Sequence, residues 1–145
     1  MHEIIKQGLS YWGSICRGRT TPLRSDFNPM HIPGLLPNMI LLGVVDGGRD
    51  FEYRVIGENI KSILFENYTG RFLSSQPHVE PDGPLMTQLR EAVQTGRPVR
   101  SPIEYIGPHS DFRKLDEINL PLANESGQVT HLLIFIVLVD KLKSE

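Results

Sequence analysis

The clearest hydrophobic pattern lies at the start of the chain, where apolar residues recur at helical spacing. Ile5, Leu9, Trp12 and Cys16 are separated by four, three and four residues, which places them on one face of a helix. The dipeptide 17–18, Arg-Gly, predicts the end of this helix, because glycine is common just past a helix C-terminus. We therefore expect an amphipathic helix that docks through this apolar face.

A second helical pattern follows Pro81. Asp82 is a plausible N-cap, and Gly96 is placed to end the helix. The apolar face of this expected helix consists of Leu85, Met86, Leu89 and Val93.

Strand patterns fill most of the remaining chain. Residues 39–46 form a short apolar run, and residues 51–56 alternate between apolar and polar side chains. The glycine-rich stretch between them predicts a turn, so the two runs read as a hairpin. Three further strands are expected at residues 99–106, 112–122 and 129–139.

The last expected strand is apolar on both of its faces. Its run from Leu132 to Val139 contains eight apolar residues in succession, which is typical of a strand that is covered on both sides. The short helices between the second and third strands would cover one face. Either the N-terminal helix or a second subunit would cover the other.

This order of elements predicts an α+β fold in a single domain. We expect a five-stranded antiparallel sheet with short helices on one face and an extra N-terminal helix. Residues 1–37 would form the helix and a connection rich in proline and arginine, and residues 38–145 would form the core.

The connection between the first helix and the first strand follows neither helical nor strand periodicity. Its four prolines steer the backbone along one irregular path, and Asn28-Pro29 predicts a short helical start. Two roles are open for its cations. An anion such as a phosphate or a cyclic dinucleotide could bind them, or an Arg24–Asp26 pair could act as a structural clasp, which we favour. The cations are Arg17, Arg19 and Arg24.

The sequence resembles the bacterial single-domain PAS family, which is marked by a Trp…Arg-Gly…Pro-x-Arg-x-Asp…Pro segment. The resemblance lies in the order of these residues along the chain. The resemblance covers nearly the whole chain, and it implies a non-enzymatic sensory or signalling module that binds a small molecule, a protein partner or both. The matching residues of the marker segment are Trp12, Arg17, Gly18, Pro22, Arg24, Asp26 and Pro29. Further matches are Leu36-Pro37, the stretch Tyr53 to Gly57, Thr69-Gly70-Arg71 and the turn Asn124 to Val129.

The PAS resemblance implies a cavity between the inner sheet face and the short helices. Strict alternation would turn Phe51, Tyr53 and Val55 to one face of the second strand, and Glu52, Arg54 and Ile56 to the other. Tyr53 could offer a hydroxyl to a ligand or keep it in water, and Arg54 could bind a carboxylate or form a structural ion pair. The candidate ligand-binding residues are Tyr53, Arg54, Phe72, Leu89 and Tyr105.

Cofactor chemistry can be judged from single residues. PAS relatives that sense light through flavin use a cysteine in an Asn-Cys-Arg-Phe-Leu-like motif, whereas the comparable segment 70–73 is Gly-Arg-Phe-Leu and Cys16 lies on the first helix. The segment 82–96 contains no histidine that could ligate haem. The histidines show no short zinc-ligand spacing, and His131 is expected at the surface or in a hydrogen bond. We expect no cofactor and no metal.

The alternatives to a sensory module are a pure interaction scaffold and a small-molecule enzyme of an α+β isomerase-like class. The enzyme would need a buried carboxylate as a base, for which Asp111, Asp116 and Glu117 are the candidates. We favour a solvated charged stretch for these residues. An acidic side chain deep in an apolar cavity would favour the enzyme.

Charge and composition limit the classes of partner that we expect. The net charge of −2 shows no basic excess of the kind that nucleic-acid binders carry. No signal peptide is apparent, and the longest apolar run is far shorter than the ~20 residues that span a bilayer. We expect a cytoplasmic protein without nucleic-acid or membrane partners. It would form a homodimer through Ile5, Leu9, Trp12 and Cys16 and act on another, unknown signalling protein.

Overall fold

The computed structural model describes residues 1–100, 103–104, 107–108 and 112–141. Its described helices are α1 (Glu3–Ser14), α2 (Glu58–Lys61) and α3 (Pro84–Thr95). The strands are β1 (Met39–Val45), β2 (Asp50–Ile56), β3 (Val99–Arg100), β4 (Ile103–Glu104), β5 (Phe112–Ala123) and β6 (Val129–Lys141). None of the described helices is long and apolar enough to cross a membrane.

The strands form one antiparallel sheet in the order β2-β1-β6-β5-β3, and β4 also pairs with β5. The expected third strand is thus present as two short segments on the same neighbour. The predicted hairpin, now β1 and β2, is confirmed. The predicted α+β fold is confirmed as well. The sheet is five strands wide, because β3 and β4 both pair with β5.

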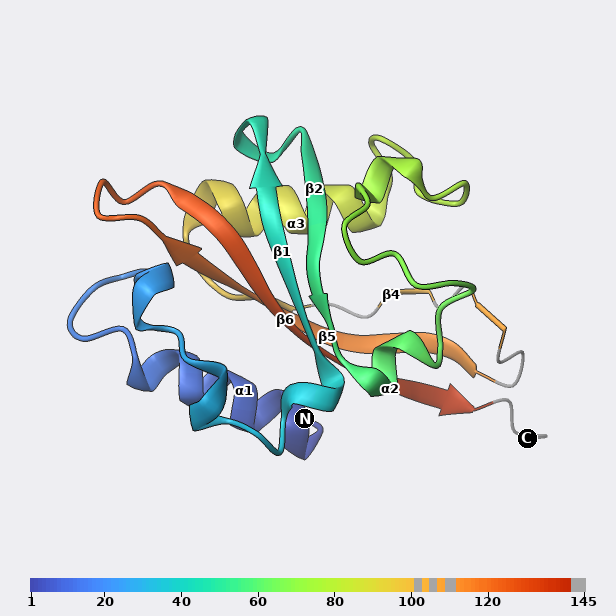
Figure 1. Cartoon of the computed structure of the whole chain (residues 1–145), viewed down its shortest axis with the longest axis horizontal. Helices are drawn as coiled ribbons and strands as arrows, with labels where there is room; N and C mark the ends of the chain where they lie inside the picture. The colour runs from blue at the N-terminus through green and yellow to red at the C-terminus, as the bar shows by residue number, and fades with distance from the viewer. Residues whose placement is uncertain (101–102, 105–106, 109–111, 142–145) are drawn as a thin grey trace.

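The sheet is covered on both faces, as the apolar sequence of β6 predicts. Figure 1 shows α1 on one side of the sheet and α3 on the other. On the inner face Leu132 and Ile134 belong to a core cluster with α3, whereas on the outer face Leu133 and Phe135 belong to a cluster with α1. Of the two covers that the sequence left open for the outer face, the structure has the chain's own N-terminal helix.

The docking of α1 depends on close approach and on one buried hydrogen bond. Ile5 is fully buried against the sheet, and Trp12 donates from Nε1 to the carbonyl oxygen of Pro121 at 2.8 Å. Gly8 faces the ring of Phe135 so closely that a Cβ there would overlap the ring. The small residue at Gly8 and the hydrogen bond of Trp12 therefore hold α1 close against the outer sheet face.

A β-bulge changes the alternation expected for β2. Leu41 pairs with Val55 but Leu42 pairs with Tyr53, so Arg54 is the extra residue. Beyond the bulge the faces exchange: Ile56 is buried in the inner cluster and Val55 is 44% exposed. The prediction that Val55 shares a face with Tyr53 was wrong for this reason.

The segment between α1 and β1 crosses the outer face through short 3₁₀ turns. Asn28 caps the turn Pro29–His31 by accepting from the backbone N–H of Met30 at 3.0 Å, as the Asn28-Pro29 dipeptide predicts. The expected Arg24–Asp26 pair is absent from the structure. Asp26 instead lies 3.9 Å from the guanidinium of Arg17, while Arg24 lies over the ring of Phe27 at 5.4 Å.

The ends of α3 agree with the sequence at one terminus only. Gly96 ends the helix in the left-handed conformation, with φ of 67°. The N-cap position is occupied by Gly83, and Asp82 was wrongly predicted as the cap. The Asp82 carboxylate instead lies 3.4 Å from Nη1 of Arg90.

The contact of α1 with the sheet can be tested with two glycines of the same helix. Gly8→Ala should destabilise the fold by about 1–3 kcal/mol, because the new methyl group would overlap the Phe135 ring. Gly13→Ala meets nothing within 4 Å and should stabilise it by up to about 1 kcal/mol through helix propensity. Urea unfolding followed by circular dichroism measures both. Equal effects of the two substitutions would contradict the docking of α1.

Candidate functional site

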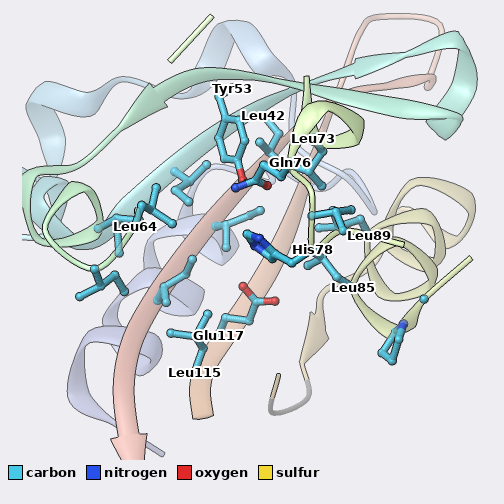
Figure 2. A pocket seen from close by; sticks show the side chains of 18 of the residues that line it. Leu42, Tyr53, Leu64, Leu73, Gln76, His78, Leu85, Leu89, Leu115 and Glu117 are labelled. Atoms are coloured by element: carbon cyan, nitrogen blue, oxygen red, sulfur yellow. The ribbon is translucent and has the colours of Figure 1, made fainter. Parts of the chain in front are cut away.

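A cavity of about 480 Å³ lies between the inner face of the sheet and the helical side of the molecule. Strands β1, β2, β5 and β6 form its floor, and α2, the connection from α2 to α3, and α3 form its walls. Most of the lining is aliphatic, with a few polar groups that point inward (Figure 2). The polar lining residues are Tyr53, Gln76, His78, Glu80 and Glu117.

Tyr53 and Gln76 form one polar pair in this lining. Both side chains are buried, and the Tyr53 hydroxyl donates to Oε1 of Gln76 at 2.9 Å. Burial, and next the nearby Glu117 carboxyl, raise the pKa of Tyr53. The phenol therefore keeps its proton and remains a hydrogen-bond donor.

Glu117 is the second polar centre, and it is only 3% exposed. Nε2 of Gln88 on α3 donates to Oε1 of Glu117 at 3.2 Å. The pKa of Glu117 is raised to about 8: burial is the main cause, a hydrogen bond with Asn119 opposes it, and the Asp116 charge adds a smaller rise. At neutral pH the buried side chain is thus mostly a neutral acid, which can donate a hydrogen bond from its hydroxyl and accept one at its carbonyl oxygen.

The interpretation of this region as a solvated charged stretch was wrong for Glu117. Alternation along β5 turns Asp116 to the opposite sheet face, where it pairs with Arg100 at 2.9 Å. Glu117 faces inward and α3 covers it. A sequence signal existed, since Ile118, Leu120 and Leu122 mark the outer face and so assign the odd-numbered positions to the inner one.

His78 brings a further polar group to the cavity from the connection between α2 and α3. Figure 2 shows its ring and the Glu117 carboxyl group both directed into the cavity, the ring from the connection and the carboxyl group from β5. The ring of Phe65 contacts His78 edge-on, with 6.4 Å between the ring centroids. Among the described residues, no three His, Cys, Asp or Glu side chains gather as metal ligands would.

The structure brings only part of the predicted ligand set to the cavity. Tyr53 and Leu89 line it. Arg54 lies on the outer face, with Nε 3.3 Å from the Glu52 carboxylate, and Phe72 is 45% exposed and lies outside the lining. Tyr105, like the candidate base Asp111, lies outside the described residues. Sequence reasoning missed Gln76, His78 and Gln88 and assigned Glu117 to solvent.

The predicted docking face is occupied within the chain. Ile5 and Trp12 are buried in the outer cluster, and the half-buried Leu9 and Cys16 pack against it. These four residues do lie on one face of α1, and that face contacts the chain's own sheet.

Comparison with known proteins identifies the family. The PAS domain model matches residues 1–136. The chain belongs to the PAS domain family. Its fold is similar to that of a fungal LOV domain photoreceptor, with a TM-score of 0.51 and 15% identity over 80% of this chain and 94% of that one. A sensory box sensor histidine kinase from Vibrio cholerae is also similar, with a TM-score of 0.53 and 15% identity over 76% and 90% of the two chains.

At this level of identity the two structures show the PAS fold and nothing about the ligand. No curated protein sequence matches this PAS domain.

Glu117 gives the stability of the PAS domain a measurable pH dependence. The unfolded chain ionises this residue near its ordinary pKa of 4.5, whereas the folded state holds the proton to about pH 8. The free energy of unfolding should therefore fall as the pH rises from about 4.5 to about 8, by up to about 1.4 kcal/mol per pH unit from this group. Glu117→Gln should remove this contribution, so the variant gains stability over the native chain toward pH 8.

Urea unfolding at a series of pH values measures the effect. Glu125→Gln, at an exposed turn position, is the matched control and should retain the slope of the native chain. An identical pH profile for Glu117→Gln and the native chain would show that Glu117 is ionised in the folded state.

Proposed function

We propose that this PAS domain is a sensory module that binds a small organic molecule in the inner cavity and passes the signal to a protein partner. The observation that carries the proposal is the cavity itself, about 480 Å³ with apolar walls and a few buried polar groups. Sites of this size and composition are typical of small-molecule binding. Membership in the PAS family supports the sensory role.

The polar groups define what such a ligand needs. A largely apolar body would replace water along the aliphatic walls, and hydrogen-bonding groups would meet the Tyr53–Gln76 pair and the neutral Glu117 acid. A ligand that left these buried groups without partners would lose affinity. The expected ligand is therefore a small molecule with separate polar groups on an apolar frame.

Flavin linked to a cysteine does not fit this cavity. The chain has one cysteine, Cys16, and it packs with the outer cluster on the opposite side of the sheet. Gly70 stands where the light-sensing relatives have their reactive cysteine. We propose that the ligand is bound without a covalent bond to the protein.

We also infer that output goes through contact with another protein, and the homodimer remains a prediction. Because α1 covers the chain's own sheet, a dimer through the α1 face requires each chain to lend its α1 to the partner's sheet. Light scattering at micromolar concentration measures the oligomeric state. A monomer would remove the homodimer from the proposal and leave the cavity unaffected.

A second candidate function, an enzyme of the isomerase-like class, is favoured by one observation. Glu117 is a buried carboxyl group in an apolar cavity, and its pKa of about 8 is suited to proton transfer near neutral pH. Once a ligand is known, incubation with the protein separates the two functions. Conversion of the ligand that Glu117→Gln abolishes would establish the enzyme, and an unchanged ligand would support the sensor.

Ligand retention is the direct test of the cavity. Native mass spectrometry of the domain purified from its own host should show a small molecule in addition to the protein mass. Leu89→Trp should abolish retention, because Leu89 lines the cavity and is 1% exposed, so the larger ring has to enter the cavity. Leu9→Trp, a change of the same size on α1 and away from the cavity, should leave retention intact. Equal retention by both variants would place the ligand elsewhere.

A further inference from the structure

The outer face of the sheet carries a second feature that the sensory cavity does not use. Gly43 of β1 pairs with His131 of β6 on one side and with Glu52 of β2 on the other. Odd-numbered residues of this part of β1 and β6 face outward, since Leu41 and Leu133 belong to the outer cluster. His131 and the position of Gly43 therefore share the outer face.

Gly43 leaves room for the side chain of Arg54 to lie across β1. A Cβ built on Gly43 would be 2.9 Å from Nε of Arg54 and 3.6 Å from its Nη2. The bulge at Arg54 turns this side chain to the outer face, and the missing side chain at Gly43 lets the guanidinium lie flat over the strand. This directs a cation toward the neighbouring strand, where His131 is paired with Gly43.

Arg24 approaches the same place from the connection after α1. A bridge between Leu23 and Ala123 holds this connection to the end of β5, and the adjacent residue Leu122 pairs with His131. The pKa of His131 is lowered by burial first, and then by the positive charges of Arg24 and Arg54. The two guanidinium groups and the imidazole thus form one cluster, here called the outer cation cluster.

Few negative charges compensate this cluster. Glu52 pairs with Arg54 at 3.3 Å. In the described part of the chain, no carboxylate lies within ion-pair distance of Arg24, which is half-buried over the Phe27 ring. The Thr130 hydroxyl, 2.9 Å from Nδ1 of His131, adds a polar group that carries no charge. The cluster therefore has an excess of positive charge that an anion would neutralise.

An apolar groove of about 380 Å³ lies on the outer face and includes Arg24, one member of the outer cation cluster, in its lining. The acidic residue of the lining, Glu58, lies just after Gly57, whose backbone N–H donates to the carbonyl of Met39. Met39 begins β1 and Gly43 lies four residues further, about 13 Å at the usual rise of a strand. Glu58 thus lies near the start of β1, whereas Gly43, over which Arg54 lies, is further along the strand. Its apolar lining includes Phe27, Leu36, Pro37, Met39, Leu41 and Val55.

We propose that this groove binds an apolar carboxylate, with the carboxylate on the outer cation cluster and the hydrocarbon chain along β1. The two arginines present planar donors that suit a carboxylate. The groove supplies an apolar surface along β1 for the hydrocarbon chain. The site is separate from the inner cavity, because the sheet lies between them.

Octanoate is the probe for this proposal, titrated into the intact domain and followed by NMR. The backbone amides of Leu41, Gly43 and Val55 should shift, and the pKa of His131 should rise when the carboxylate adds a negative charge beside Arg24 and Arg54. Arg24→Gln and Arg54→Gln should each weaken binding by about tenfold, the effect of losing one charge-assisted hydrogen bond. Octanol, which has the same chain without the charge, should bind at least tenfold more weakly.

Two matched controls locate the site. Arg71→Gln removes another exposed arginine, which is paired with Glu66, and Glu117→Gln alters the inner cavity; neither should change octanoate binding. Gly43→Ala should weaken binding through displacement of Arg54 alone. Equal binding of octanol and octanoate, or unchanged affinity in both arginine variants, would overturn the proposal, and so would shifts confined to the inner cavity.

Discussion

The burial of β6 on both faces is the constraint on which the rest of the structure depends. Eight successive apolar residues, from Leu132 to Val139, cannot be left in water on either side of a sheet. The chain meets this requirement with α1 on the outer face and α3 with the short turns on the inner face. The two covers differ in fit: α1 approaches closely at Gly8, whereas the inner cover leaves a cavity.

The inner cavity also contains Glu117, a buried carboxyl group whose removal from water costs folding free energy. A carboxyl group removed from water resists ionisation, and the structure offers Glu117 an amide from Gln88 without a compensating cation in the described part of its surroundings. Apolar side chains at this position would satisfy the sheet equally well. The presence of an acid at a position that packing alone would fill with an aliphatic residue is the physical argument that the cavity has a chemical role.

The sequence predicted what depends on periodicity and missed what depends on distant contacts. Spacing alone identified the apolar face of α1, the β1–β2 hairpin and the double coverage of β6. It could not show the bulge at Arg54, because nothing in the local alternation marks an extra residue. Alternation along β5 could turn Glu117 inward, but it could not show the cover from α3, whose Gln88 is 29 residues away along the chain. The partner of Asp26 was wrong for a similar reason: the turn brings Arg17 to it and leaves Arg24 on Phe27.

Strand alternation makes β1 a wall of both candidate sites. Leu41 lines the outer groove and Leu42 lines the inner cavity, so successive side chains of β1 belong to different sites. The groups that separate the sites come from elements that reach only one face. Glu117 and Leu89 belong to the inner cavity alone, and Arg24 belongs to the outer groove alone. The polar groups of the two candidate sites therefore come from elements that flank β1, because the strand itself supplies apolar side chains to both.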